Sequence, residues 1–175
     1  MKYALTYGLL SGLVIIATML SGILLGGQDS FFSSMWFGYL VMLVALTFIF
    51  VGVKRYRDID HGGVIKFVPA LAMGLAIAAV AGLAYIIVWE AYLALTDYRF
   101  MDDYVAGILR AREAEGASAA ALAREAAELE SMRVSYRNPL FRVPMTFLEI
   151  FPVGLLVALF SAFLLRNPKL LPATR

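Results

Sequence analysis

The chain has 175 residues, of which 62% are hydrophobic and only 16% are charged, and its mean hydropathy is +0.80. A soluble domain typically has about 25% charged residues, so this composition indicates an integral membrane protein with little room for a separate soluble domain. The formal charge of +2 gives no reason to expect a nucleic-acid partner, and the absence of cysteine excludes disulfides, thiolate metal sites and thiol nucleophiles.

Four stretches are long and apolar enough to cross a bilayer, whose hydrocarbon core of about 30 Å requires about 20 helical residues. In chain order they are Tyr3–Leu25, Met35–Val53, Phe67–Leu95 and Val143–Leu165. The first has a longer apolar run than the roughly 7–15 residues of a signal peptide, so we expect an uncleaved span. Pro69 and Pro144 stand in the first turns of the third and fourth spans, where a missing N–H costs little.

Lys and Arg residues indicate the orientation, because cytoplasmic loops are enriched in them. They precede the first span, separate the second from the third and follow the fourth, at Lys2, Lys54, Arg55, Arg57, Lys66, Arg166, Lys169 and Arg175. The 26–34 connection has only Asp29 as a charged residue. This pattern predicts cytoplasmic N- and C-termini, although seven arginines after the third span oppose the assignment.

Residues 97–142 are charged and rich in alanine, which predicts a short extracytoplasmic helical hairpin between the third and fourth spans. Asp102 and Asp103 are candidate caps of its first helix. The alternative is that the third span continues unbroken into this helix, since neither Pro nor Gly separates them.

Within the hairpin, Gly116 is expected to end the first helix and Ser118 to cap the second. Asn138-Pro139 is expected to end the second helix. The predicted fold is therefore an all-α integral membrane bundle of four transmembrane helices, with 1–175 as a single membrane domain.

Small residues mark helix interfaces in lipid, because helix association there depends on close packing and hydrogen bonds. They recur along the first, third and fourth spans at Gly8, Ser11, Gly22, Gly74, Ala78, Gly82, Gly154 and Ala158. We expect these stripes to pack the four helices within one chain, with a homo-oligomer seam or a pathway lining as the alternative.

Glu90 and Glu149 are the most informative residues, because an ionisable side chain inside a span is costly and is a functional candidate by default. If the two carboxyls approach each other, they form a candidate proton or cation site. Pro152 adds to this possibility, since it lacks the N–H that would bind the carbonyl of Leu148.

A structural interpretation of the same carboxyls stands beside the functional one. Glu90 lies between Trp89 and Tyr92, and these two residue types are enriched at membrane–water interfaces. Glu149 has Arg142 two helical turns before it, and Arg99 is a second candidate counter-ion. Glu149 is also about 140° from Gly154 around an ideal helix, so the two face different directions.

The segment that follows the second span combines basic, aromatic and acidic residues. Its candidate headgroup-binding or topology-anchoring residues are Lys54, Arg55, Tyr56, Arg57 and Lys66. Asp58, Asp60 and His61 are a weak match to a metal site, so we expect no metal. No catalytic motif is recognisable, and no cofactor is expected.

Three groups of short motifs carry a resemblance to a known family. They are Lys54-Arg55-Tyr56-Arg57-Asp58 followed by Gly62-Gly63 and Phe67, then Gly116-Ala117-Ser118, and finally Pro152-Val153-Gly154 with Ser161-Ala162 and Arg166. With these motifs the chain resembles an uncharacterised family of small bacterial membrane proteins, domain of unknown function 4199. The resemblance implies a four-span inner-membrane protein and carries over neither a catalytic residue nor a substrate.

The sequence thus favours a non-enzymatic accessory or interaction protein, surrounded by membrane lipids, whose 97–142 hairpin is the candidate protein-binding surface. The alternatives are a small proton- or cation-coupled transporter that uses Glu90 and Glu149, and a lipid-binding membrane protein.

Overall fold

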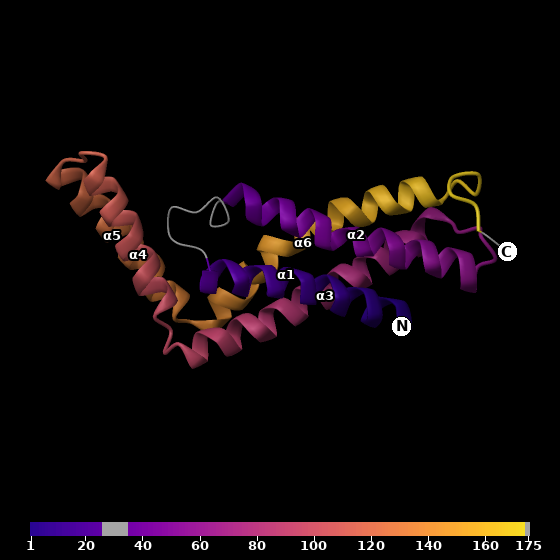
Figure 1. The fold of residues 1–175 in the computed structure, drawn as a ribbon, viewed down its shortest axis with the longest axis horizontal. Helices are drawn as coiled ribbons and strands as arrows, with labels where there is room; N and C mark the ends of the chain where they lie inside the picture. Colours follow the sequence, from indigo (N-terminus) through magenta and orange to yellow (C-terminus); the bar gives the residue numbers. More distant parts are fainter. Residues whose placement is uncertain (26–34, 174–175) are drawn as a thin grey trace. The chain divides into compact units, whose positions relative to one another are not determined.

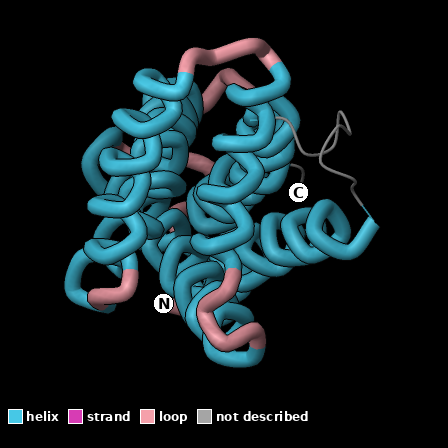
Figure 2. The backbone as a smooth tube through the Cα atoms, turned by 90° about the vertical axis from the view of Figure 1, so that its left-hand side faces the viewer, coloured by secondary structure: helices cyan, strands magenta, loops and turns pink. Residues whose placement is uncertain are grey.

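The computed structural model describes residues 1–25 and 35–173, so Asp29 and Arg175 lie outside the described residues. The helices are α1 (Lys2–Leu25), α2 (Met35–Asp60), α3 (Phe67–Leu95), α4 (Phe100–Ala114), α5 (Ala119–Tyr136) and α6 (Pro139–Leu165). Figure 2 shows only helices and their connections in the described part of the chain, which confirms the all-α fold. Four helices, α1, α2, α3 and α6, are long and apolar enough to cross a membrane.

The chain divides into two compact units. One unit consists of Met1–Ile87 and Phe147–Arg175, and contains α1, α2 and most of α3 and α6. The other is Val88–Thr146, and contains α4 and α5 with the adjoining ends of α3 and α6.

The first unit is held together by close contacts between small residues, and its four helices run side by side in Figure 1. In α3, a Cβ atom added to Gly74 would lie 2.8 Å from the Cβ of Ala158 in α6. Reciprocally, a Cβ added to Gly154 would lie 2.8 Å from the Cβ of Ala78. Because each glycine faces the alanine of the other helix, the two backbones approach closely without side chains between them.

The helix α1 packs against α3 in the same manner. A Cβ on Gly8 would lie 2.5 Å from the Cβ of Val80. Ser11 is fully buried, and its hydroxyl has no hydrogen-bond partner among the described residues. Gly82 faces the ring of Phe147, whereas Gly22 lies outside the residues whose packing is described.

Two helices differ from their predicted limits. The apolar run of α2 ends at Val53, but the helix continues for two polar turns to Asp60. A 2.5 Å ion pair between Lys54 and Asp58, one helical turn apart, stabilises these turns. The helix α6 begins at Pro139 rather than at 143. Asn138 caps it by accepting a 3.0 Å hydrogen bond from the Leu140 N–H, and Pro139 takes the first helical position.

The third span does not continue into the hairpin. After Leu95 the Tyr98 N–H donates to the Leu93 carbonyl and the Asp97 N–H donates to the Ala94 carbonyl, which together form a Schellman motif. Asp97 and Tyr98 both take positive φ values, 53° and 58°. The chain therefore turns without the glycine that usually occupies such a position.

The hairpin helices form with one correction. Gly116 has a φ of +82° and follows the last turn of α4, and the Ser118 side chain accepts a 3.3 Å hydrogen bond from the Ala121 N–H, as predicted. The prediction that Asp102 or Asp103 caps α4 is wrong, since Arg99 is the N-cap residue. The two carboxylates lie in the first turn instead, where they interact favourably with the helix dipole.

Candidate functional site

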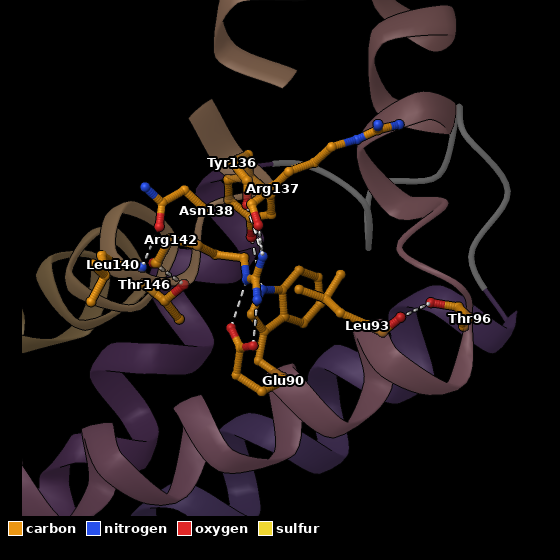
Figure 3. A network of polar contacts seen from close by, with 10 residues as sticks. Glu90, Leu93, Thr96, Tyr136, Arg137, Asn138, Leu140, Arg142 and Thr146 are labelled. Atoms are coloured by element: carbon orange, nitrogen blue, oxygen red, sulfur yellow. Dashed lines mark hydrogen bonds and ion pairs between the residues drawn. The ribbon is translucent and has the colours of Figure 1, made fainter. Parts of the chain in front are cut away.

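Among the polar side chains of the second unit, Arg142 makes the most hydrogen bonds, and it lies in the first turn of α6. It is 2% exposed, and its Nε donates to Glu90 Oε1 at 2.7 Å while its Nη2 donates to Glu90 Oε2 at 2.5 Å (Figure 3). Both oxygens of the Glu90 carboxylate are therefore bound by one guanidinium. This two-point geometry is the strongest form of an arginine–carboxylate contact.

The remaining donors of Arg142 reach the end of α5. Its Nη1 donates to the carbonyl oxygen of Tyr136 at 2.8 Å and to that of Arg137 at 3.4 Å. Carbonyls at a helix C-terminus lack partners within the helix and carry partial negative charge, so a cation is favourable there. Arg142 thus joins α3, the end of α5 and the start of α6 (Figure 3).

Aromatic rings surround this guanidinium. Its Cζ lies 5.1 Å from the ring centroid of Tyr98 and 5.7 Å from that of Tyr136. Trp89 donates its indole N–H to the Tyr136 hydroxyl at 2.8 Å, and its ring meets Phe100 edge-on at 4.8 Å. These rings lie beside the ion pair, whose guanidinium is almost fully buried.

Both carboxylate oxygens of Glu90 have a permanently charged partner in this arrangement. Arginine remains charged at any physiological pH, so the Arg142–Glu90 pair keeps a fixed partner for each carboxylate oxygen. The geometry is that of a structural link between three helices.

Glu149 has a different environment. It belongs to the first unit and is exposed on the surface of α6, whereas Gly154 of the same helix is buried against α3. Its carboxyl group makes no hydrogen bond or ion pair with the described residues of its own unit. The two expected counter-ions are engaged within the second unit, where Arg142 binds Glu90 and Arg99 lies 3.8 Å from Asp97.

A second polar cluster lies at the end of α2. Arg57 is fully buried, and its Nε donates to Asp58 Oδ1 at 2.7 Å. Its Nη1 donates to the Leu170 carbonyl at 3.0 Å, and its Nη2 donates to the carbonyl of Leu171. The side chain expected to anchor headgroups is therefore occupied in binding the segment that follows α6.

The other residues of this cluster divide between internal contacts and exposed positions. Arg55 and Lys66 are exposed, while Tyr56 contacts the ring of His61 edge-on at 4.6 Å. Asp60 accepts a 2.8 Å hydrogen bond from the Tyr3 hydroxyl and lies 3.7 Å from the Lys2 amine. Over residues 1–25 and 35–173, no group of three His, Cys, Asp or Glu side chains is arranged to hold a metal ion.

Sequence reasoning missed the pairing of Arg142 with Glu90. A usable signal existed, because Glu90 stands five residues before the predicted end of the third span and Arg142 directly precedes the fourth. Opposite charges at the facing ends of two sequential spans are candidates for pairing. The carbonyls of Leu170 and Leu171 offered no such signal, since every residue has a carbonyl.

Comparison with known proteins gives one match. Residues 3–167 match the family described as "Protein of unknown function (DUF4199)". No curated protein and no solved structure matches the chain.

Proposed function

The chain belongs to the DUF4199 family of unknown function, and within it we propose a non-enzymatic accessory protein of the bacterial inner membrane that binds another protein through the α4–α5 hairpin. In this proposal α1, α2, α3 and α6 cross the membrane with both termini in the cytoplasm. The basic residues at the N-terminus, between α2 and α3 and after α6 support this orientation.

The observation that carries the proposal is that the hairpin is held together by its own ion pairs. Arg133 lies 2.7 Å from Asp102, and Arg112 lies 3.2 Å from Glu125, so each end of α4 is tied to α5. Only Met101 of α4 and Leu129 of α5 are buried. A polar pair of helices with so small a core leaves most of its side chains available to a partner.

Large apolar side chains remain exposed on this hairpin. Tyr104, Met132 and Val134 are all exposed, and the Asp102–Arg133 contact places Tyr104 and Met132 at the same level of the two helices. Aromatic residues and methionine are enriched in the cores of protein interfaces. This level of the hairpin is therefore the proposed centre of the binding surface.

A photo-activated cross-linking residue placed at Tyr104 or Met132 in cells tests the proposal. We expect one discrete adduct from each position and none from Ala127, an exposed position of α5. Charge reversal at exposed Glu128 should reduce the yield, while reversal at exposed Arg55 outside the hairpin should not. Equal adducts from Tyr104, Met132 and Ala127, or none from any of them, would contradict the proposal.

What weighs against a proton- or cation-coupled transporter is the state of Glu90, whose two oxygens already accept hydrogen bonds from Arg142. A transporter requires that replacing Glu90 and Glu149 together with Gln abolish flux into liposomes. Under the present proposal the protein gives no proton-linked flux before or after the replacement.

A further inference from the structure

The face of α6 directed away from the bundle has a regular pattern. Glu149 and four apolar residues recur along it at intervals of three and four residues, at Glu149, Pro152, Leu156, Phe160 and Phe163, and all five are exposed. This is the spacing of a helix–helix contact surface. The opposite face carries Gly154, Ala158 and Ala162, which are buried within the first unit.

Glu149 is the unusual member of this face. It lies ten residues from the start and sixteen from the end of α6, inside the apolar helix and nearer to its first end. A carboxyl group costs about 2.5–3.5 kcal/mol at the centre of a spanning helix on insertion scales, and intramembrane ionisable groups almost always pair with another polar group. The described residues of the first unit, to which Glu149 belongs, supply no such partner.

A hydrogen-bond acceptor lies beside Glu149 on the same helix. Pro152 has no N–H, so the carbonyl of Leu148 lacks the donor that an ordinary helix would place four residues later. The side chain of Leu148 is exposed as well, at 60%. A carboxyl group that can donate and a carbonyl that lacks a donor therefore stand one residue apart on an exposed helix surface.

We propose that this face of α6 binds the same face of a second copy of the chain. Two copies inserted with one topology hold Glu149 at one depth, so a two-fold axis along the membrane normal brings the two carboxyl groups together. Each neutral carboxyl group then donates a hydrogen bond across the interface, either to the other carboxyl group or to the other copy's Leu148 carbonyl. This proposal is independent of what the α4–α5 hairpin binds.

Self-complementarity favours a second copy over a different partner. A single exposed basic residue on another membrane protein would also neutralise Glu149, but it would leave the Leu148 carbonyl without a donor unless the partner supplied a second group. A second copy supplies both a donor and an acceptor at the required depth. The apolar residues Leu156, Phe160 and Phe163 meet their own counterparts on the remainder of the face.

The absence of cysteine from the chain permits a direct test in membranes. Single cysteines are introduced by Leu156→Cys and Phe160→Cys, and by Leu13→Cys in α1 and Leu43→Cys in α2, which are exposed control positions. We expect oxidation to give a band of twice the chain mass from the two α6 positions and not from the controls. Equal dimer formation from all four positions, or no dimer from α6, would overturn the proposal.

The role of the carboxyl group is tested in the Leu156→Cys background. Glu149→Leu removes the hydrogen bonds and should lower the association constant roughly 5- to 30-fold, the factor that corresponds to about 1–2 kcal/mol. Glu149→Gln keeps a donor and an acceptor and should retain most of the dimer. The melting temperature of each Glu149 variant is compared with that of the monomeric Leu156→Cys protein. We expect the two temperatures to be equal, which shows that a variant has lost association and has not misfolded. An unchanged dimer in Glu149→Leu, or cross-linking only to a different protein, would refute the proposal.

Discussion

Arg142 and Glu90 lie 52 positions apart in the sequence and are joined by two hydrogen bonds of 2.7 and 2.5 Å. The guanidinium also binds the last carbonyls of α5. One side chain thus fixes the end of the third span, the end of the hairpin and the start of the fourth span.

Removal of either member of this pair should destabilise the protein. We expect Arg142→Gln to lower the free energy of unfolding by about 3 kcal/mol, because it leaves the partly buried Glu90 carboxylate without a counter-ion and the Tyr136 carbonyl without a charged donor. The measurement is thermal or denaturant unfolding in detergent micelles, followed by the fluorescence of Trp89.

The double replacement Glu90→Gln with Arg142→Gln is the control for this prediction. Two neutral amides avoid an unpaired charge, so the double variant should lose less stability than the sum of the two single variants. Additive losses would show that the two residues are not coupled.

The turn after α3 offers a stabilising change. Asp97 has a φ of 53° at a position where a helix usually ends in glycine, so Asp97→Gly should raise the free energy of unfolding by about 1 kcal/mol. The converse change Gly116→Ala, at a φ of +82°, should lower it by a similar amount. A lower melting temperature for Asp97→Gly would indicate that the Asp97 carboxylate contributes more than its backbone strain costs.

The contact between α3 and α6 should not tolerate a larger side chain. Gly74→Leu places a Cβ 2.8 Å from that of Ala158, and we expect a loss of about 1–3 kcal/mol from overpacking. Gly38 in α2 is the matched control, because no atom lies within 4 Å of an added Cβ. Gly38→Leu should leave the melting temperature unchanged or raise it, because leucine has the higher helix propensity.

The hairpin should weaken at acidic pH. Hydrogen bonds from Arg133 hold the pKa of Glu130 below its ordinary value. The stabilisation that this lowered pKa reflects is fully present above the ordinary pKa of a glutamate, and is lost as the pH falls through the lowered pKa of the folded state. The protection factors of the α5 amides, which are corrected for the intrinsic pH dependence of hydrogen exchange, should therefore fall at acidic pH.

Glu130→Gln is the control for this pH dependence. The variant cannot take up a proton at this site, so the acid-induced change in α5 protection should be smaller than in the unmodified protein. Identical pH profiles would show that protonation of Glu130 does not cause the change.

The local features of the fold could be predicted from the sequence because their causes act within a few residues. The length of each apolar run identified the four spanning helices, and the limits of α3 agree with the prediction. Gly116 and Ser118 marked the hairpin turn, since a left-handed residue and a side-chain cap are local requirements. The start of α6 was misplaced because Pro139 can either end one helix or begin the next.

The contacts between distant residues were harder to predict, since opposite charges at the ends of two spans make Arg142 a candidate partner of Glu90 but do not select it among the other arginines. Which cation pairs with Glu90 depends on the end of α5 reaching the start of α6, and nothing near Glu90 specifies that approach. The break at Asp97 was likewise hidden, because an aspartate and a tyrosine take left-handed conformations there in place of a glycine. Burial of Arg57 depends on carbonyls that no side chain identifies.

The acceptors of Arg57 lie 113 and 114 positions after it. During synthesis, α2 is therefore complete long before Leu170 and Leu171 leave the ribosome. Until then, the two Nη groups of Arg57 donate their hydrogen bonds to water or to lipid phosphate. Final closure of this end of the bundle is a late event in biogenesis. Truncations that remove Leu170 and Leu171 should consequently be recognised by membrane quality-control proteases, even though every spanning helix is intact.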